Sequence, residues 1–343
     1  MKKNFYKGAM LTSVLAVCML LLVGCGTNLF EGFADEPEET DPIDLIKQAS
    51  SPEDYNKVEE VALIVISSEN ANPEQKQDAL IANAEAIFGQ NEVSSLEIGA
   101  KFADAASDGS TSGDNMIVEI SETVGLTDEN GDVSEEKKTD ILIAALSTNA
   151  ASALTTELIG SSFKAQADTA GELDANESLI GMMANALAAF VIINDVITLQ
   201  EDGTIDEAQV QADYGGDYRQ VLTLLIEPTL SAEVTDFLNL IDPELKAKIE
   251  ASTFPLGVAY FGDECINFIT SDKVKLFKDD QVDIIRRIQE YTGDFYQLYE
   301  AVTTDGTYTN GSTSVTFSSE DSDDTTSDKV QTVIEDIFKD FKL

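Results

Sequence analysis

The sequence predicts an all-α protein, either a bundle or a solenoid-like array of helical hairpins, with one small β-hairpin near the C-terminus. Asp, Ser or Asn stands directly before a proline at the start of several apolar-periodic segments, which is typical of helix N-termini. Short polar loops separate those segments, as in antiparallel helical hairpins. One stretch, GTYTNGSTSVTF, instead alternates threonine with large apolar residues and carries a hairpin-turn signal at Asn310 and Gly311.

The first three helices are recognised in the sequence by the residues at their N-termini. They are predicted to begin at Asp41–Pro42, Ser51–Pro52 and Asn72–Pro73. Gln75 stands where it can complete a capping box with Asn72, and Gly89 is predicted to end the third helix. A further helix is expected over residues 91–106.

The middle of the chain contains the longest apolar segment of the sequence after its first thirty residues. Helices are predicted over Glu135–Ser147 and Ala150–Phe163, with a break near Asn149. The apolar segment, Leu179–Leu199, is long enough to span a membrane, but it contains Asn185, Asn194 and Asp195. Because such groups are costly in lipid, we expect it to be the central helix of a globular bundle.

The C-terminal half continues the helical pattern. Helices are predicted over Asp206–Ala212, Asp217–Glu227, Ala232–Leu240, Pro243–Ala251 and Asp280–Val302. After the β-hairpin, the acidic stretch to residue 327 is predicted to be a solvated linker. The final helix, Asp328–Phe341, has its apolar residues on one stripe: Val330, Val333, Ile334, Ile337, Phe338 and Phe341. We expect this stripe to dock on the protein's own bundle, the alternative being a groove in a partner.

The N-terminus has the pattern of a secretory signal. Three lysines in the first seven residues precede the apolar run Ala9–Val23, which is too short to stay as a membrane helix. The run ends in Leu22-Val23-Gly24-Cys25, which resembles the lipobox of bacterial lipoproteins. The resemblance implies cleavage after Gly24, a diacylglyceryl thioether on Cys25 and an acyl chain such as palmitate on the new amino terminus. The alternative is an ordinary secretory signal with a chance cysteine.

The residues that follow the lipobox bear on location. Residue 26 is Gly, whereas an Asp there resembles an inner-membrane retention signal. The resemblance therefore implies a lipid-anchored cell-envelope protein, in the outer membrane and facing the periplasm if the source has two membranes. Residues 25–40 are acidic and lack apolar periodicity, so we expect them to form a flexible tether.

A second resemblance covers residues 41–106. Tyr55 and Lys57 open one helix, Pro73 lies at the junction, and small residues line the next helix: Ala79, Ala82, Ala84 and Ala86. This stretch is similar to a unit of the tetratricopeptide-type helical-repeat family, including bacterial helical-repeat lipoproteins. The resemblance implies the start of an α-solenoid.

Charge and composition exclude several classes of function. The formal net charge is -43, and removal of residues 1–24 with their three lysines makes it -46. Phosphate backbones should be repelled by such a chain, so nucleic-acid binding is not expected. The sequence contains no His, which excludes Ser-His, Cys-His and His-metal sites. Processing leaves Cys265 as the one thiol, and its apolar surroundings predict a buried, inert side chain.

Two acidic loops resemble parts of a calcium-binding EF-hand. Asp128, Asn130 and Asp132 match the first three ligand positions of such a loop. Asp202, Gly203 and Asp206 match part of another. The alternative is that both loops start helices through capping boxes: Asp132–Glu135 and Thr204–Glu207. Calcium is therefore a candidate cofactor rather than a predicted one.

The predicted organisation has five parts: a signal peptide (1–24), a lipidated tether (25–40), a helical domain (41–302), a hairpin with an acidic linker (303–327) and a C-terminal helix (328–343). We expect no enzymatic activity and a helical surface that binds another envelope protein. The alternative is a periplasmic small-ligand or cation-binding component associated with transport, with a pocket near Asn185, Asn194 and Asp195. If these side chains only form hydrogen bonds to neighbouring helices, they give no reason to expect a pocket.

Overall fold

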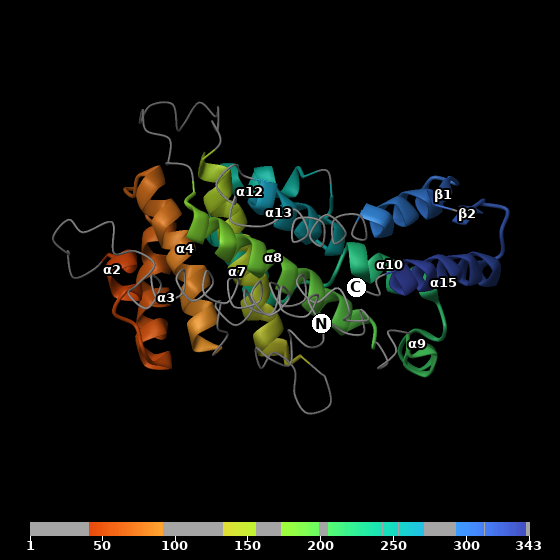
Figure 1. The fold of residues 1–343 in the computed structure, drawn as a ribbon, viewed down its shortest axis with the longest axis horizontal. Helices are drawn as coiled ribbons and strands as arrows, with labels where there is room; N and C mark the ends of the chain where they lie inside the picture. The colour runs from red at the N-terminus through yellow and green to blue at the C-terminus, as the bar shows by residue number, and fades with distance from the viewer. Residues whose placement is uncertain are drawn as a thin grey trace, which may run out of the picture.

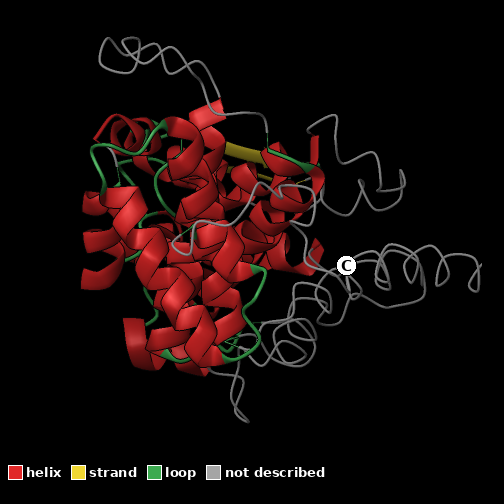
Figure 2. Ribbon diagram, turned by 90° about the vertical axis from the view of Figure 1, so that its left-hand side faces the viewer, coloured by secondary structure: helices red, strands yellow, loops and turns green. Residues whose placement is uncertain are grey.

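The computed structural model describes residues 41–91, 133–155, 173–198, 205–241, 243–252, 254–270, 293–311 and 313–340. Its helices are α2 Pro42–Ile46, α3 Pro52–Ser67, α4 Pro73–Gln90, α7 Glu135–Thr155, α8 Ala175–Val196, α9 Glu207–Tyr214, α10 Tyr218–Ile226, α11 Ala232–Leu240, α12 Pro243–Glu250, α13 Val258–Thr270 and α15 Asp323–Asp340. Residues 293–303 are also helical. The strands are β1 Thr307–Asn310 and β2 Thr313–Thr316. The predicted fold class, all-α with a small C-terminal hairpin, is confirmed (Figure 2).

The helices form an array in which, from α3 to α8, each described helix packs on the next one described along the chain. α3 packs on α4, α4 on α7, α7 on α8, and α8 on α13. α10 contacts α8 and α13 and connects them to α15. Figure 1 shows α2 and α3 at one end of the molecule and the β-hairpin with α15 at the other. The core therefore runs along the array.

Small residues allow the first helices to pack closely. The alanines of α4 that the sequence singled out are fully buried, as are several on α7 and α8: Ala79, Ala82, Ala84, Ala86, Ala144, Ala145, Ala150, Ala151, Ala184 and Ala188. Alanine loses no side-chain entropy on folding and favours helix, so it gives a compact interface at little cost.

The predicted starts of the first three helices are confirmed. Asp41 Oδ1 accepts a hydrogen bond from Ile43 N at 2.9 Å, and Ser51 Oγ accepts one from Asp54 N at 3.3 Å. At α4 the capping box is complete, because Asn72 Oδ1 accepts from Gln75 N and Gln75 Oε1 accepts from Asn72 N. Each cap satisfies backbone N–H groups that the helix itself leaves without partners.

Two predicted helix interruptions are wrong. α4 continues through Gly89 to Gln90. An added Cβ at Gly89 would lie 2.5 Å from the ring of Tyr55, so this glycine makes room for α3 rather than ending a helix. α7 continues through Asn149, because the side chain of Asn149 bonds a neighbouring helix instead of its own backbone.

α8 occupies the interior of the array. It begins at Ala175 and ends at Val196, earlier at both ends than predicted. By length and composition, one described helix, Asn176–Val196, could span a membrane, and 78% of its apolar stretch is buried within the protein. α4, α7, α10 and α13 all pack against α8. The structure therefore places α8 as a core helix, in agreement with the sequence prediction.

Side chains at the starts of α7 and α9 accept hydrogen bonds from backbone N–H groups of the first helical turn. α9 is capped by Asp206, whose carboxylate accepts from the backbone N–H groups of residues 208 and 209. At α7, Ser134 Oγ accepts from Lys137 N at 3.3 Å. Asp132 and Thr204 lie outside the described residues.

The β-hairpin forms where it was predicted, but its turn is shifted by one residue. Asn310 pairs with Thr313, so positions 311 and 312 join the strands, and Gly311 takes a positive φ of 53°. The side chain of Asn310 instead donates to Asp294 Oδ2 at 2.7 Å. Tyr308 is fully buried, which shows that the hairpin packs against the helices.

The acidic stretch before the last helix is not all linker. α15 begins at Asp323, five residues earlier than predicted, because the Ser322 hydroxyl accepts a hydrogen bond from Thr325 N at 3.2 Å at its start. The apolar stripe is buried at the four positions whose side chains are described: Val330, Val333, Ile334 and Ile337. α15 packs on α10 and β2, so this helix docks on its own domain.

Candidate functional site

Three of the seven predicted site residues fall within the described part of the chain. These are Asn185, Asn194 and Asp195, all on α8. Cys25, which is predicted to be lipidated, lies outside the described residues, as do the three calcium candidates: Asp128, Asn130 and Asp132.

Asn185 is fully buried in the middle of α8 and bonds across to α7. Its Nδ2 donates to Asn149 Oδ1 at 2.7 Å, and Asn149 Nδ2 donates back to Asn185 Oδ1 at 3.0 Å. Asn185 Nδ2 also donates to the Gly181 carbonyl at 2.8 Å, and Asn149 Nδ2 donates to the Tyr260 hydroxyl of α13 at 3.4 Å. We call Asn149, Asn185 and Tyr260 the amide bridge; it joins three helices.

The amide bridge is electrically neutral. Burial raises the pKa of Tyr260 well above its ordinary value, so its hydroxyl keeps its proton and can accept from Asn149. A ligand at this place would have to break an amide pair that already satisfies both side chains, at a cost of about 1–3 kcal/mol for each buried group left without a partner. The bridge therefore acts as a structural contact between α7, α8 and α13.

Asn194 and Asp195 lie near the other end of α8 and contact the start of α7. Asn194 Oδ1 accepts from Val133 N at 3.3 Å, and Asp195 forms an ion pair with Lys138 Nζ at 2.6 Å. Asn194 is nine positions after Asn185, about 13 Å along the helix axis. The structure does not bring the three side chains together. The predicted pocket is therefore not supported, because each of these polar side chains bonds residues in or just before a neighbouring helix.

A group of carboxylates that the sequence analysis missed lies between α4 and the start of α8. It comprises Asp78 and Glu85 on α4 with Asp174 and Glu177 at the start of α8, and we call it the acidic seam. Burial raises the pKa of Asp78 to about 7 and that of Glu85 to about 8, and repulsion from Glu177 adds to both shifts. Asp78 and Glu85 are seven positions apart and so share one helix face, a spacing that could have signalled the seam.

The acidic seam can exchange protons near neutral pH, because two of its carboxyl groups titrate there. Among the residues that the structure describes, no group of three or more His, Cys, Asp or Glu side chains could hold a metal ion. Burial favours the protonated form of Asp78 and Glu85 in the acidic seam.

Cys265 lies on α13 and is 1% exposed. Burial raises the pKa of its thiol to about 12, so the nucleophilic thiolate is not populated near neutral pH. The prediction of a buried cysteine is confirmed, and its chemistry is that of a small apolar side chain.

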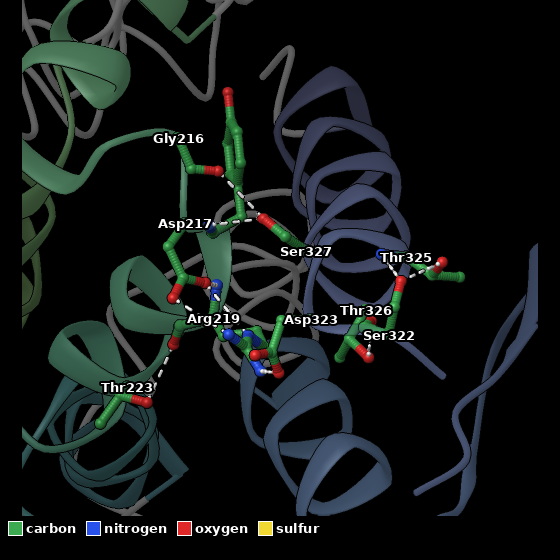
Figure 3. A network of polar contacts seen from close by, with 10 residues as sticks. Gly216, Asp217, Arg219, Thr223, Ser322, Asp323, Thr325, Thr326 and Ser327 are labelled. Atoms are coloured by element: carbon green, nitrogen blue, oxygen red, sulfur yellow. Dashed lines mark hydrogen bonds and ion pairs between the residues drawn. The ribbon is translucent and has the colours of Figure 1, made fainter. Parts of the chain in front are cut away.

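A polar contact fixes the C-terminal helix on α10. The Ser327 hydroxyl accepts from Tyr218 N at 3.0 Å and donates to the Gly216 carbonyl at 3.0 Å (Figure 3). Ser327 thus satisfies a backbone N–H at the start of α10 from outside that helix. This role of Ser327 could not be predicted from the sequence, since Ser327 stands in an acidic Ser/Thr stretch with no apolar periodicity.

An ion pair extends the same contact. The guanidinium of Arg219 donates to Asp217 on its own helix, and its Nη1 donates to Asp323 Oδ1 of α15 at 2.6 Å (Figure 3). We call Arg219, Asp217, Asp323 and Ser327 the C-terminal clamp. Asp323 is largely exposed, so this ion pair contributes little stability, and the buried Ser327 hydroxyl is the stronger element.

Comparisons with family models, curated proteins and solved structures found no match to this chain.

Proposed function

We propose that the chain is a lipid-anchored protein of the bacterial cell envelope, without catalytic activity, whose helical array binds another envelope protein. The observation that carries this proposal is the order of packing: from α3 to α8 each described helix contacts the next one described along the chain, and α8 then contacts α13. Arrays of stacked helices expose extended surfaces on their outer helices, while α8 lies in the interior.

The interior of the array supports a non-catalytic role. The buried amides of Asn149 and Asn185 bond to each other in the amide bridge, and the buried thiol of Cys265 is protonated. The absence of His from the whole sequence excludes the commonest general base. These observations favour a protein that acts through its surface.

The lipid anchor is inferred from the sequence alone. Cys25 follows a lipobox-like segment, and each acyl methylene buried in a bilayer contributes about 0.8 kcal/mol to membrane binding. If residues 26–40 behave as a flexible chain, the root-mean-square distance between their ends is about 20 Å, which sets how far the helical domain lies from the lipid on average. In a source with two membranes, we place the domain in the periplasm beneath the outer membrane.

The test is a crosslinking pull-down of the full-length protein from its own membranes, compared with the variant Cys25→Ala. We expect one dominant envelope partner with the parent, loss of membrane association in the variant, and an acylated N-terminal peptide by mass spectrometry. If no protein is enriched over the variant, the scaffold proposal is wrong. Thermal shift against metals and metabolites would then test the alternative, a small-ligand or cation-binding component.

A further inference from the structure

Aromatic rings from separate parts of the chain gather at one place on the surface. Phe254, just before α13, meets Tyr296 edge to face, with ring centroids 4.7 Å apart and planes at 87°. Tyr299 follows one turn after Tyr296 on the helix of residues 293–303. All three rings are half-buried, so each presents part of its surface to solvent.

Two exposed carboxylates flank these rings. Glu227, at the end of α10, accepts a hydrogen bond from the Tyr299 hydroxyl at 2.9 Å. Glu300 lies beside Tyr296, and partial burial together with this carboxylate raises the pKa of Tyr296. The hydrogen bond to Glu227 and partial burial raise the pKa of Tyr299 as well. We call Phe254, Tyr296, Tyr299, Glu227 and Glu300 the aromatic–acidic surface.

This combination of groups fits a cation. An ammonium or guanidinium group is attracted to the face of an aromatic ring and also pairs with a carboxylate. The same chemistry occurs elsewhere in the described part of the chain, where Lys329 Nζ lies 6.0 Å from the centre of the Phe317 ring. Tyrosine and phenylalanine are also enriched at the centres of protein interfaces.

The negative net charge of the whole chain also favours a basic partner. The mature chain carries a net charge of -46, which attracts basic surfaces from a distance and repels acidic ones. The aromatic–acidic surface adds short-range contacts where such a partner can dock.

We propose that the aromatic–acidic surface is the docking site for a lysine- or arginine-bearing segment of the partner protein. This inference rests on the proposed function and adds the chemistry of the partner. Helix residues 293–303, the end of α10 and Phe254, in the segment that leads into α13, together make the contact.

The test uses the full-length protein in neutral detergent and a fluorescent nine-residue peptide that alternates Lys and Arg with Gly. Binding is measured by fluorescence anisotropy at about 150 mM salt, where charges farther apart than about 8 Å are largely screened. We expect Tyr296→Leu, which leaves the net charge unchanged, to weaken binding about fivefold, the scale of one cation–π contact. Glu300→Gln should weaken it by a similar factor.

The control is Glu53→Gln, which removes an exposed acid on α3 at the other end of the molecule (Figure 1). We expect this variant to bind within twofold of the parent. Thermal melting establishes that each variant is folded. If loss of the Tyr296 ring displaces Phe254, Glu300→Gln tests the surface without changing a ring.

Three results would overturn the inference. They are no binding by the parent, equal binding of a peptide with Glu in place of Lys and Arg, and equal weakening by Glu300→Gln and Glu53→Gln with no effect of Tyr296→Leu. The last would mean that diffuse charge alone attracts the peptide. Because the peptide assay needs no native partner, its failure is distinct from failure of the membrane pull-down, which tests the scaffold itself.

Discussion

At the scale of single residues, one pair of buried polar side chains, Asn149 and Asn185, forms hydrogen bonds across a helix interface. The sequence identified Asn185 as a polar interruption of an apolar helix, but it could not name the partner, which lies 36 positions away on α7. Asn149 was predicted to break a helix, because asparagine favours turns when it bonds its own backbone. Tertiary structure reverses this preference, since Asn185 offers Asn149 a better partner across the interface.

The amide bridge predicts a specific pattern of stability. Asn149→Leu and Asn185→Leu should each lower the free energy of unfolding by about 1–3 kcal/mol, because each leaves the buried oxygen of the other amide without its hydrogen-bond donor. The double variant should cost less than the sum of the two, since it removes both amides. Urea unfolding of the parent and the three variants measures this coupling, with the exposed Asn56→Leu as control. Strictly additive losses would mean that the two amides do not act as a pair.

The acidic seam predicts a dependence of stability on pH. The carboxyl groups of Asp78 and Glu85 titrate near pH 7 and 8 in the folded protein and near pH 4 when unfolded. Between about pH 4 and pH 8 the folded protein therefore binds more protons, so its stability falls as the pH rises. The double variant Asp78→Asn/Glu85→Gln should lose most of this slope. At pH 8 it should exceed the parent by about 1–3 kcal/mol, allowing for screening at these half-buried groups.

Urea unfolding at pH 5.5 and pH 8 tests this prediction. Glu233→Gln removes an exposed acid on α11 and measures the contribution of general charge repulsion, which has the same sign. If the parent and the double variant show the same change between the two pH values, the seam does not hold protons as described.

At the scale of elements, helix starts were predictable and helix interruptions were not. Caps are local, because a side chain bonds a backbone N–H two or three residues away, so Asp41, Ser51 and Asn72 could be identified from the sequence. The role of Gly89 depends on the ring of Tyr55, which lies on another helix. The early start of α15 was missed because an acidic Ser/Thr stretch lacks the apolar periodicity that signals a helix.

The end of the helix of residues 293–303 carries backbone strain that can be relieved. Asp305 has a φ of 55°, in the left-handed region that favours glycine, and Gly306 N donates to the Ala301 carbonyl at 2.8 Å to close the helix end. Asp305→Gly should therefore stabilise the protein by about 0.5–1 kcal/mol, and Asp305→Ala should destabilise it. Thermal melting measures both, with Thr304→Gly, one position earlier, as the control that should destabilise. A loss of stability in Asp305→Gly would show that the Asp305 side chain outweighs the strain.

At the scale of the whole molecule, the array determines how far a local change is felt. The fold class followed from periodicity and helix starts, but the order of packing needed the structure, because the sequence does not reveal which helix faces meet. α3 and α15 lie at opposite ends, and the contacts between them run through α4, α7, α8 and α10 (Figure 1). In such an array the stability of each helix depends mainly on the helices that it contacts. The two ends of the array can therefore unfold locally and independently of each other.

The C-terminal clamp provides a test of this independence. Ser327→Ala removes the hydroxyl that bonds both Tyr218 N and the Gly216 carbonyl, and this leaves a buried backbone N–H of α10 without its partner. We expect faster amide hydrogen exchange in α10 and α15, by about fivefold or more for a cost of about 1 kcal/mol, and unchanged exchange in α3 and α4. Thr332→Ala, an exposed site on the same helix, is the matched control. Equal acceleration in α3 and α15 would mean that the described helices unfold as one cooperative unit, and the array would then transmit a change at one end to the other.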